Sequence, residues 1–261
     1  MDSEIREEVE NTGEALPSGV ATAVEGGLRT FCILAGGQFI SLLGSSLTTF
    51  ALGLYIYNQS NSVTLLGLVI LAASLPGILI APLAGSLVDR LSRRTVMLLS
   101  DSAAGVTTMI VAVLIIAGQL QQWHIFALAI INSLAGAFQE PAYSASVPLL
   151  VPKRHLGRAS GFVQLSQAIA RIFAPLLAGF LLVVSGIWLV LVIDVTTFLI
   201  AFGTLLCLKI PSPEREQESV ATSPLMLVRE LFGDTLRALG FLRQRVGLLA
   251  LLMLFSAVNV L

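Results

Sequence analysis

Six long apolar runs set the strongest limit on how this chain of 261 residues can fold. Crossing a hydrocarbon layer of about 30 Å takes roughly 20 helical residues, because backbone polar groups in lipid must hydrogen-bond within their own segment. The runs cover residues 31–57, 63–87, 96–117, 125–146, 159–184 and 187–208, and a seventh covers 246–261. The sequence therefore predicts an all-α membrane protein: a six-helix transmembrane bundle followed by the start of a seventh span.

The composition excludes several other classes of protein. Only 12% of the residues are charged, whereas soluble domains carry about 25%, and a net charge of -1 leaves no basic excess for nucleic acid. Cys32 and Cys207 form no C-x-x-C pair, so neither a disulfide framework nor a metal cage is expected. His124 and His155 are expected in loops on opposite sides of the membrane, which leaves no histidine for a catalytic site inside it. We expect no enzyme activity, no cofactor and no metal.

The basic residues mark one side of the membrane. The segments before the first run and after the second, fourth and sixth runs hold 14 of the 15 Lys and Arg residues, whereas the alternate connections hold none. Short cytoplasmic loops are enriched in Lys and Arg, so we expect a multi-pass protein of the cell membrane with a cytoplasmic N-terminus. Aromatic anchors at the opposite helix ends agree with this topology: Tyr55, Tyr57, Trp123 and Trp188.

Four segments are expected along the chain. Residues 1–28 are acidic and lack an apolar core, so they predict a disordered cytoplasmic tail rather than a signal peptide. Residues 29–208 hold the six-span bundle. Residues 209–245 predict a cytoplasmic linker, in which apolar residues at helical spacing over 225–245 indicate an amphipathic helix on the membrane surface. Residues 246–261 are interpreted as a truncated seventh span.

A short repeat divides the six spans into two sets of three. Ala81-Pro82-Leu83-Ala84-Gly85 ends the second span, and Ala174-Pro175-Leu176-Leu177-Ala178-Gly179 lies in the fifth with one residue inserted. Each lies in the middle helix of its set, and three is odd, so the second set must be inverted in the membrane relative to the first. Inverted repeats are typical of transporters that work by alternating access. The alternative is a chance recurrence of residues common in spanning helices.

The connection between the second and third spans carries a more specific motif. It reads Gly85-Ser86-Leu87-Val88-Asp89-Arg90-Leu91-Ser92-Arg93-Arg94. This resembles the loop signature of the major facilitator superfamily, G-x-L-x-D-R-x-G-R-R/K, with Ser92 in place of the second glycine. Residues 138–148 and 171–179 resemble the corresponding stretches of macrolide-efflux type drug exporters, although Ala174 and Ala178 replace glycines of the related antiporter signature.

The resemblance implies a transporter of twelve spans, of which this chain holds the first half and part of the seventh span. It implies export of drugs or other amphiphilic small molecules by alternating access, with protons as the coupling ion. It also implies that the loop latches against the other half of the transporter. We expect the loop and a cytoplasmic gate to comprise Gly85, Asp89, Arg90, Arg93, Arg94 and Asp101, with Arg93 or Arg94 bridging to Asp101. Gly85 is expected to admit a close backbone approach. The alternative is a solvated loop that only sets topology.

Ionisable residues within spans are expensive and are therefore functional candidates. Arg171 lies about thirteen residues, or roughly 20 Å, into the fifth span, and Asp194 in the sixth is a plausible partner for it. Glu140 lies near the cytoplasmic end of the fourth span. We interpret Glu140 and Asp194 as candidate proton carriers and Arg171 as part of the same machinery, with a static ion pair as the alternative for each.

Polar side chains at helical spacing form stripes on three spans. We interpret them as the lining of a substrate cavity, with ordinary helix packing through small and polar residues as the alternative. The candidates are Gln38, Ser41 and Ser45 in the first span, Asn132 and Gln139 in the fourth, and Gln164 and Gln167 in the fifth. The function predicted is a secondary active exporter whose partners are a small-molecule substrate, protons and membrane lipids. The alternative is a non-transporting fragment, or a half-size module that needs a second half or a dimer partner.

Overall fold

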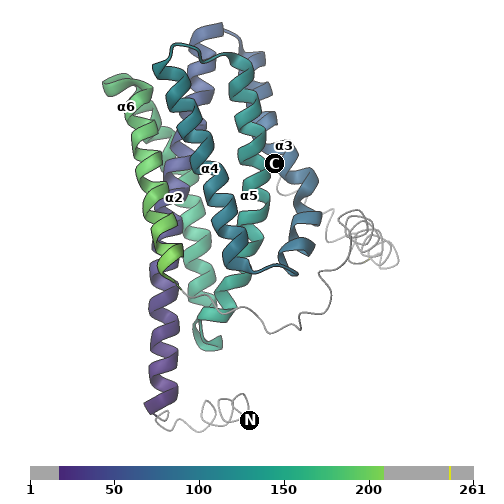
Figure 1. The fold of residues 1–261 in the computed structure, drawn as a ribbon, viewed down its shortest axis with the longest axis vertical. Coiled ribbons are helices and arrows are strands. Elements are labelled where there is room, and N and C mark those ends of the chain that lie inside the picture. The colour runs from purple at the N-terminus through teal and green to yellow at the C-terminus, as the bar shows by residue number, and fades with distance from the viewer. Residues whose placement is uncertain (1–17, 209–246, 248–261) are drawn as a thin grey trace.

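The computed structural model describes residues 18–208 and the single residue Gly247, and these described residues are helical throughout apart from short connections. The elements are α2 (Ser18–Ser60), α3 (Val63–Val88), α4 (Arg93–Ile116), α5 (Gln122–Leu150), the 3-10 helix η1 (Lys153–His155) and α6 (Leu156–Cys207) (Figure 1). This confirms the all-α membrane bundle. The expected surface helix over 225–245 and the seventh span over 246–261 lie outside the described residues, except for Gly247, which is helical.

The helix α6 contains two spans. Gly186, with φ 71° and ψ -173°, interrupts its helical backbone, and a positive φ of this kind is readily adopted only by glycine. The chain reverses there, so α6 supplies the fifth and sixth spans on either side of Gly186 (Figure 1). The five helices α2 to α6 within residues 18–208 therefore account for all six predicted spans.

The first helix begins earlier than the sequence pattern predicts. α2 starts at Ser18, whereas the tail was expected to extend to Leu28, so residues 18–28 are helical rather than disordered. The apolar pattern that marks the span begins only at Phe31. Residues 18–28 contain three glycines but no proline to break a helix, so the helix can extend past the hydrophobic segment that marks it in the sequence.

The helices pack in the crossed manner expected of two equivalent three-helix sets. The first helix of one set packs on the second helix of the other: α2 on the first part of α6, through Ala51 and Ala178, and α3 on α5, where the Gly77 amide donates to Ser133 Oγ over 2.9 Å. The two third helices also meet, since a Cβ at Gly105 of α4 would touch the Phe198 ring in the second part of α6. This pairwise correspondence is what an inverted repeat produces.

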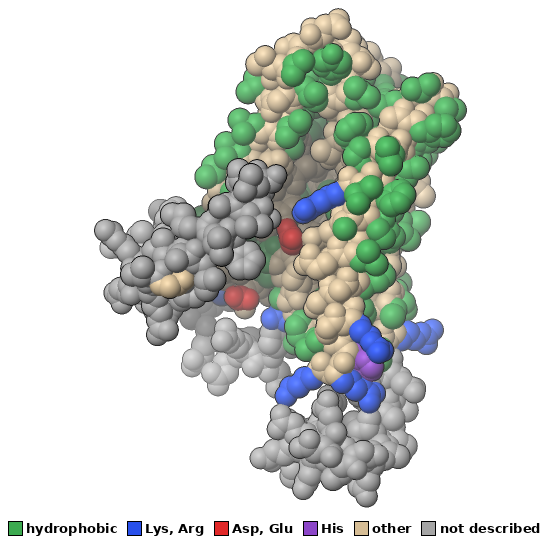
Figure 2. All heavy atoms as spheres, turned by 180° about the vertical axis from the view of Figure 1, so that it is seen from behind, with side chains coloured by type: hydrophobic (Ala, Val, Ile, Leu, Met, Phe, Trp, Pro, Cys, Tyr) green, Lys and Arg blue, Asp and Glu red, His purple; other side chains and the backbone are tan. Residues whose placement is uncertain are grey.

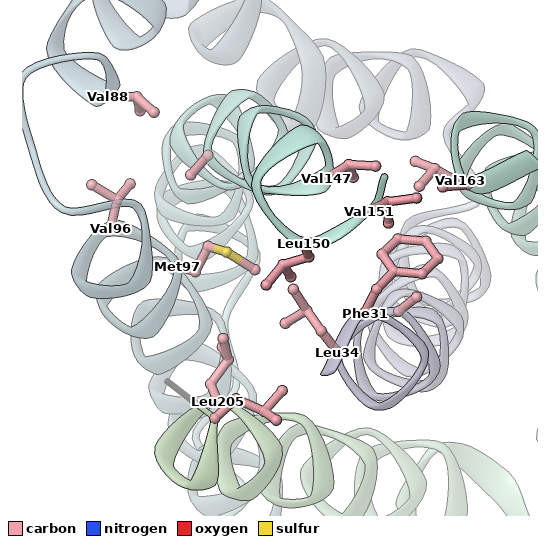
Figure 3. Close-up of a cluster of buried hydrophobic side chains, with 14 residues drawn as sticks. Phe31, Leu34, Val88, Val96, Met97, Val147, Leu150, Val151, Val163 and Leu205 are labelled. Carbon is pink, nitrogen blue, oxygen red and sulfur yellow. The ribbon is translucent and has the colours of Figure 1, made fainter. Parts of the chain in front are cut away.

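Apolar clusters close the bundle at both ends. Figure 3 shows the cluster at the end that carries the basic loop, where all five helices contribute, including Phe31, Leu34, Val88, Met97, Leu150 and Leu205. A second cluster fills the opposite end with Leu52, Ile56, Val69, Val111, Ile125 and Leu191. Along α2, the residues between these two clusters include the buried polar side chains Gln38, Ser41 and Thr48.

The surface separates into a basic end and an apolar belt. Figure 2 shows the Lys and Arg side chains gathered mainly at one end, with hydrophobic side chains covering the flanks of the helices above them. Many large apolar residues are exposed there, among them Ile78 and Leu79 of α3 and Val183 of α6. Such a belt suits lipid contact, where helix association depends on close packing and interhelical hydrogen bonds rather than on apolar burial.

Candidate functional site

The Asp101 carboxylate is held by two glutamines from other helices. Gln38 Nε2 of α2 donates to its Oδ2 over 3.1 Å, and Gln139 Nε2 of α5 donates to its Oδ1 over 2.9 Å. Gln139 Nε2 also donates to Gln38 Oε1 over 2.7 Å. Asp101 is 6% exposed. These three side chains, here called the amide cluster, connect α2, α4 and α5 inside the bundle.

The expected bridge from Arg93 or Arg94 to Asp101 is not formed. Arg93 donates to the Ala145 carbonyl of α5 over 2.6 Å, and Arg94 donates to the Leu205 and Leu206 carbonyls of α6 over 3.0 and 2.7 Å. Seven or eight helical residues separate the arginines from Asp101, about 11 Å along the axis. Side chains at the start of a helix also tilt toward its N-terminus, which directs both arginines away from the carboxylate. The two guanidinium groups instead fasten α4 to α5 and α6.

The loop itself has ordinary backbone geometry. Ser92, which replaces the signature's second glycine, has φ -66° and caps α4, with its Oγ accepting from the Thr95 amide over 3.3 Å. A Cβ at Gly85 would meet no atom within 4 Å, so the close approach expected there does not occur among the described residues. Asp89 caps the C-terminal end of α3 and, like Arg90, is exposed.

The Asp194 carboxylate is the second buried acid and is held by hydroxyl groups. Thr108 Oγ1 of α4 donates to its Oδ2 over 2.8 Å, and Ser45 Oγ of α2 donates to its Oδ1 over 3.3 Å. Asp194 is 3% exposed. Gly44 makes this approach possible, since a Cβ there would lie only 2.9 Å from Asp194 Oδ1. Asp194, Ser45 and Thr108, here called the hydroxyl cluster, connect α2, α4 and the second part of α6.

Arg171 is not the partner of Asp194. It is exposed and makes no hydrogen bond or ion pair with another described residue. On the same helix, Gln164 is exposed and Gln167 is half-buried, and Gln167 Nε2 donates to Glu140 Oε1 of α5 over 3.3 Å. Glu140, Gln164, Gln167 and Arg171 are here called the polar face. Figure 2 shows that the molecule is hollowed between its two columns of helices on the side away from the viewer of Figure 1.

The three predicted stripes therefore have different surroundings. Gln38 and Ser41 of α2 are buried and Ser45 is half-buried, so this stripe faces other helices. Asn132 and Gln139 of α5 also bond inward, and Asn132 Oδ1 accepts from Thr107 Oγ1 over 2.7 Å. Only the stripe on α6 is largely exposed. The first stripe thus packs against other helices, and the third is the most exposed, while the interpretation of the stripes as a cavity lining stays a prediction.

Sequence reasoning missed two threonines that complete these contacts. Thr107 and Thr108 are consecutive hydroxyl residues inside the third apolar run, and both are buried. A Thr pair within a spanning segment is itself a signal, because each hydroxyl in lipid requires a partner. Consecutive residues on a helix point in different directions, so two neighbouring hydroxyl groups can bond to two different helices. Thr107 bonds to Asn132 of α5, and Thr108 bonds to Asp194 of α6.

Comparison with known proteins places this arrangement among membrane transporters. A family model described as Major Facilitator Superfamily matches residues 34–261. Macrolide efflux protein A of Streptococcus pyogenes is 31% identical over 226 residues, which cover 85% of this chain and 53% of that protein. Macrolide efflux protein A of Enterococcus faecalis is 33% identical over 182 residues, covering 69% of this chain and 53% of that protein.

A relative of lower identity is also named as a transporter. A Bacillus subtilis protein named uncharacterized MFS-type transporter YfiS is 27% identical over 169 residues, which cover 64% of this chain and 39% of that protein. The chain spans about half the length of the macrolide efflux proteins it matches.

Proposed function

The chain belongs to the Major Facilitator Superfamily, and from that premise we propose that it is part of a secondary active exporter of drugs or other amphiphilic small molecules. The proposed mechanism is alternating access coupled to protons, in which one proton moves inward as the substrate moves outward. Similarity to two proteins named for macrolide efflux makes macrolide-like compounds the first substrates to test.

One observation carries this proposal: polar side chains are exposed on spanning helices at the polar face. An exposed charged or amide side chain within a span faces water or another part of the protein, because contact with lipid tails is expensive. Glu140 and Arg171 supply opposite charges there, and Gln164 and Gln167 supply hydrogen-bonding groups between apolar neighbours. Such a surface can hold an amphiphile that has a basic or hydroxyl group and a large apolar body.

Two carboxylates are the candidates for carrying the proton. Glu140 is exposed on the polar face and accepts from Gln167, so its charge can interact directly with a substrate. Asp194 is buried and accepts hydrogen bonds from hydroxyl groups, so a proton bound there would act through helix packing. Asp101, expected at the gate, has the same buried character as Asp194. We propose Glu140 as the residue at which substrate and proton compete.

The orientation proposed follows the charge asymmetry. All described basic residues except Arg171 belong to the N-terminal part of α2, the connection between α3 and α4 with the first turn of α4, or the region around η1. With that end in the cytoplasm, Asp89, Arg90, Arg93 and Arg94 lie at the inner surface of the cell membrane, next to lipid phosphates. The proposed latch would use the exposed Asp89, since Arg93 and Arg94 bond within this bundle.

Transport in everted membrane vesicles tests the proposal. Vesicles containing the complete gene product should accumulate a radiolabelled macrolide when their interior is made acidic, and a protonophore should abolish the accumulation. The Glu140→Gln variant should bind the macrolide but no longer respond to the proton gradient. Equal accumulation of the macrolide with and without the gradient would reject proton antiport. Accumulation no greater than in vesicles that lack the protein would reject export of macrolides.

A second candidate is a half-size module that needs another half or a second copy of itself. The exposed polar face favours this candidate as well, since a partner bundle would cover it. Mass measurement of the purified gene product in detergent separates the two. A dimer of this chain that transports would establish a half-size transporter, and a monomer without transport would indicate a module that depends on a separate half.

A further inference from the structure

A cavity lies at the end of the bundle opposite the basic residues, away from the polar face. Its volume is about 480 Å³, and its walls come from the end of α2 and the start of α5. Tyr55, Gln59, Gln121, Gln122 and Trp123 form the walls. The cavity rests on Ile56 and Ile125, which belong to the buried apolar cluster at this end.

Hydrogen bonds hold the walls of the cavity in place. Gln59 Nε2 donates to Tyr55 Oη over 3.0 Å, and Trp123 Nε1 donates to Gln121 Oε1 over 2.7 Å. The Trp123 ring lies against the His124 ring, with centroids 3.7 Å apart. The His124 Nδ1 accepts from the Gln121 amide over 3.1 Å, which fixes the first turn of α5. These contacts join Gln59 to Tyr55 and Trp123 to Gln121 and His124 on the cavity wall.

The cavity is polar without being charged. Residues 55–62 and 118–125 contain no Asp, Glu, Lys or Arg, and His124 is their one titratable group besides the two tyrosines. Amide side chains both donate and accept, which matches hydroxyl groups. Tyrosine and tryptophan rings present large apolar faces with a polar atom at the edge. The cavity offers no counter-charge to an ionic ligand. A ring that bears several hydroxyl groups could pack on the aromatic faces and hydrogen-bond to the glutamine amides.

We propose that this cavity binds a neutral, hydroxyl-rich amphiphile, with a glycosyl group or similar ring between Trp123 and Gln59. The apolar part of such a ligand would lie along the lipid-facing ends of α2 and α5. This site is separate from the polar face, and its occupation does not depend on transport. Under the orientation proposed above, it would be open to the side away from the cytoplasm.

Trp123 provides a direct measure of binding. The chain has two tryptophans, so the Trp188→Phe variant leaves Trp123 as the only tryptophan within residues 1–261. The purified gene product in lipid nanodiscs should show a saturable change in Trp123 fluorescence with octyl β-glucoside below its micelle concentration. The Gln59→Leu variant should bind at least about threefold more weakly, because a hydrogen-bonding wall is lost.

Two controls make the outcome decisive. Gln119 is exposed in the connection between α4 and α5, at the same end of the bundle as Gln59, but does not line the cavity, so Gln119→Leu should leave the affinity unchanged. Octanol, which has the same chain without the sugar, should produce no saturable change. The proposal is overturned by a response to octanol equal to that of the glucoside, by equal losses in the two glutamine variants, or by no saturable change. None of these outcomes bears on macrolide transport.

Discussion

Asp194 and Arg171 lie on the two parts of α6 and have opposite surroundings. Asp194 is 3% exposed and accepts hydrogen bonds from α2 and α4. Arg171 is exposed and bonds to no other described residue. The same contrast separates the amide and hydroxyl clusters, which face other helices, from the polar face, which faces outward.

The difference shows that a polar residue within a span can either hold helices together or be exposed at the surface of the bundle. Between lipid-exposed helices, interhelical hydrogen bonds contribute about 0.6–2 kcal/mol each and fix which helices meet. The amide and hydroxyl clusters supply such contacts among α2, α4, α5 and α6. Among the described residues the polar face contributes one such bond, from Gln167 to Glu140, so we interpret its exposed side chains as a surface for contact with water, substrate or another bundle. Stability and transport should therefore respond to different substitutions.

Replacement of Asp194 should have the largest effect on stability. Asp194→Ala removes the acceptor of two hydrogen bonds and leaves the Ser45 and Thr108 hydroxyls without it, which should lower the free energy of unfolding by about 3 kcal/mol. Asp194→Asn keeps the volume and one acceptor, so it should lose about 1 kcal/mol. Thermal unfolding in detergent measures both. Equal stability of Asp194→Ala and the parent protein would contradict the claim that the buried clusters, unlike the polar face, stabilise the bundle.

Glycine at the contact of α2 with α6 should rank next. In Gly44→Ala the new Cβ would lie 3.1 Å from Asp194 Cα and closer still to Thr197 Oγ1, so the helices must separate, with a loss of about 2 kcal/mol. Gly36 lies two turns earlier, and a Cβ there would meet nothing within 4 Å. Gly36→Ala should therefore be neutral or slightly stabilising. The same unfolding assay compares the two variants, and an equal loss in both would show that close packing at Gly44 is not required.

Arg94 should give a smaller loss. Its guanidinium group donates from two nitrogens to the carbonyls of Leu205 and Leu206, a geometry that a lysine ammonium group does not reproduce. Arg94→Lys should lower the stability by about 1 kcal/mol, whereas Arg158→Lys, at an exposed position near the same end, should have no measurable effect. Hydrogen exchange should also show faster opening around residues 205–208 in Arg94→Lys. An unchanged exchange rate at these residues would contradict the proposal that Arg94 holds α4 against α6.

Much of the fold could be predicted because its signals are local. Each span is marked by its own apolar run, and the turn at Ser185 and Gly186 is short enough to require antiparallel neighbours. The basic residues add a second signal that does not depend on hydropathy. The start of α2 could not be placed, because the helix continues beyond the apolar residues that mark the span.

The partners of the buried polar groups could not be predicted from spacing. Asp101 is seven residues from Arg94 in sequence, but its partner Gln38 is 63 residues away on another helix. Periodicity places Gln38 and Gln139 on helical faces without showing which face meets which. Stripes of the same residue types also occur both inside the bundle and on the polar face. The buried stripes can be told from the exposed one only when the packing of α2 against α6 and the other helices is known.

Export measured with Arg171→Gln tests the central claim most directly. Cells producing the complete gene product should lose most of their macrolide efflux with this variant, while the purified protein unfolds at the same temperature as the parent. Arg158→Gln, on the same helix but at the basic end, should retain both efflux and stability. Full efflux by Arg171→Gln, or a loss of stability comparable to that of Asp194→Ala, would contradict the assignment of the polar face to the transport pathway.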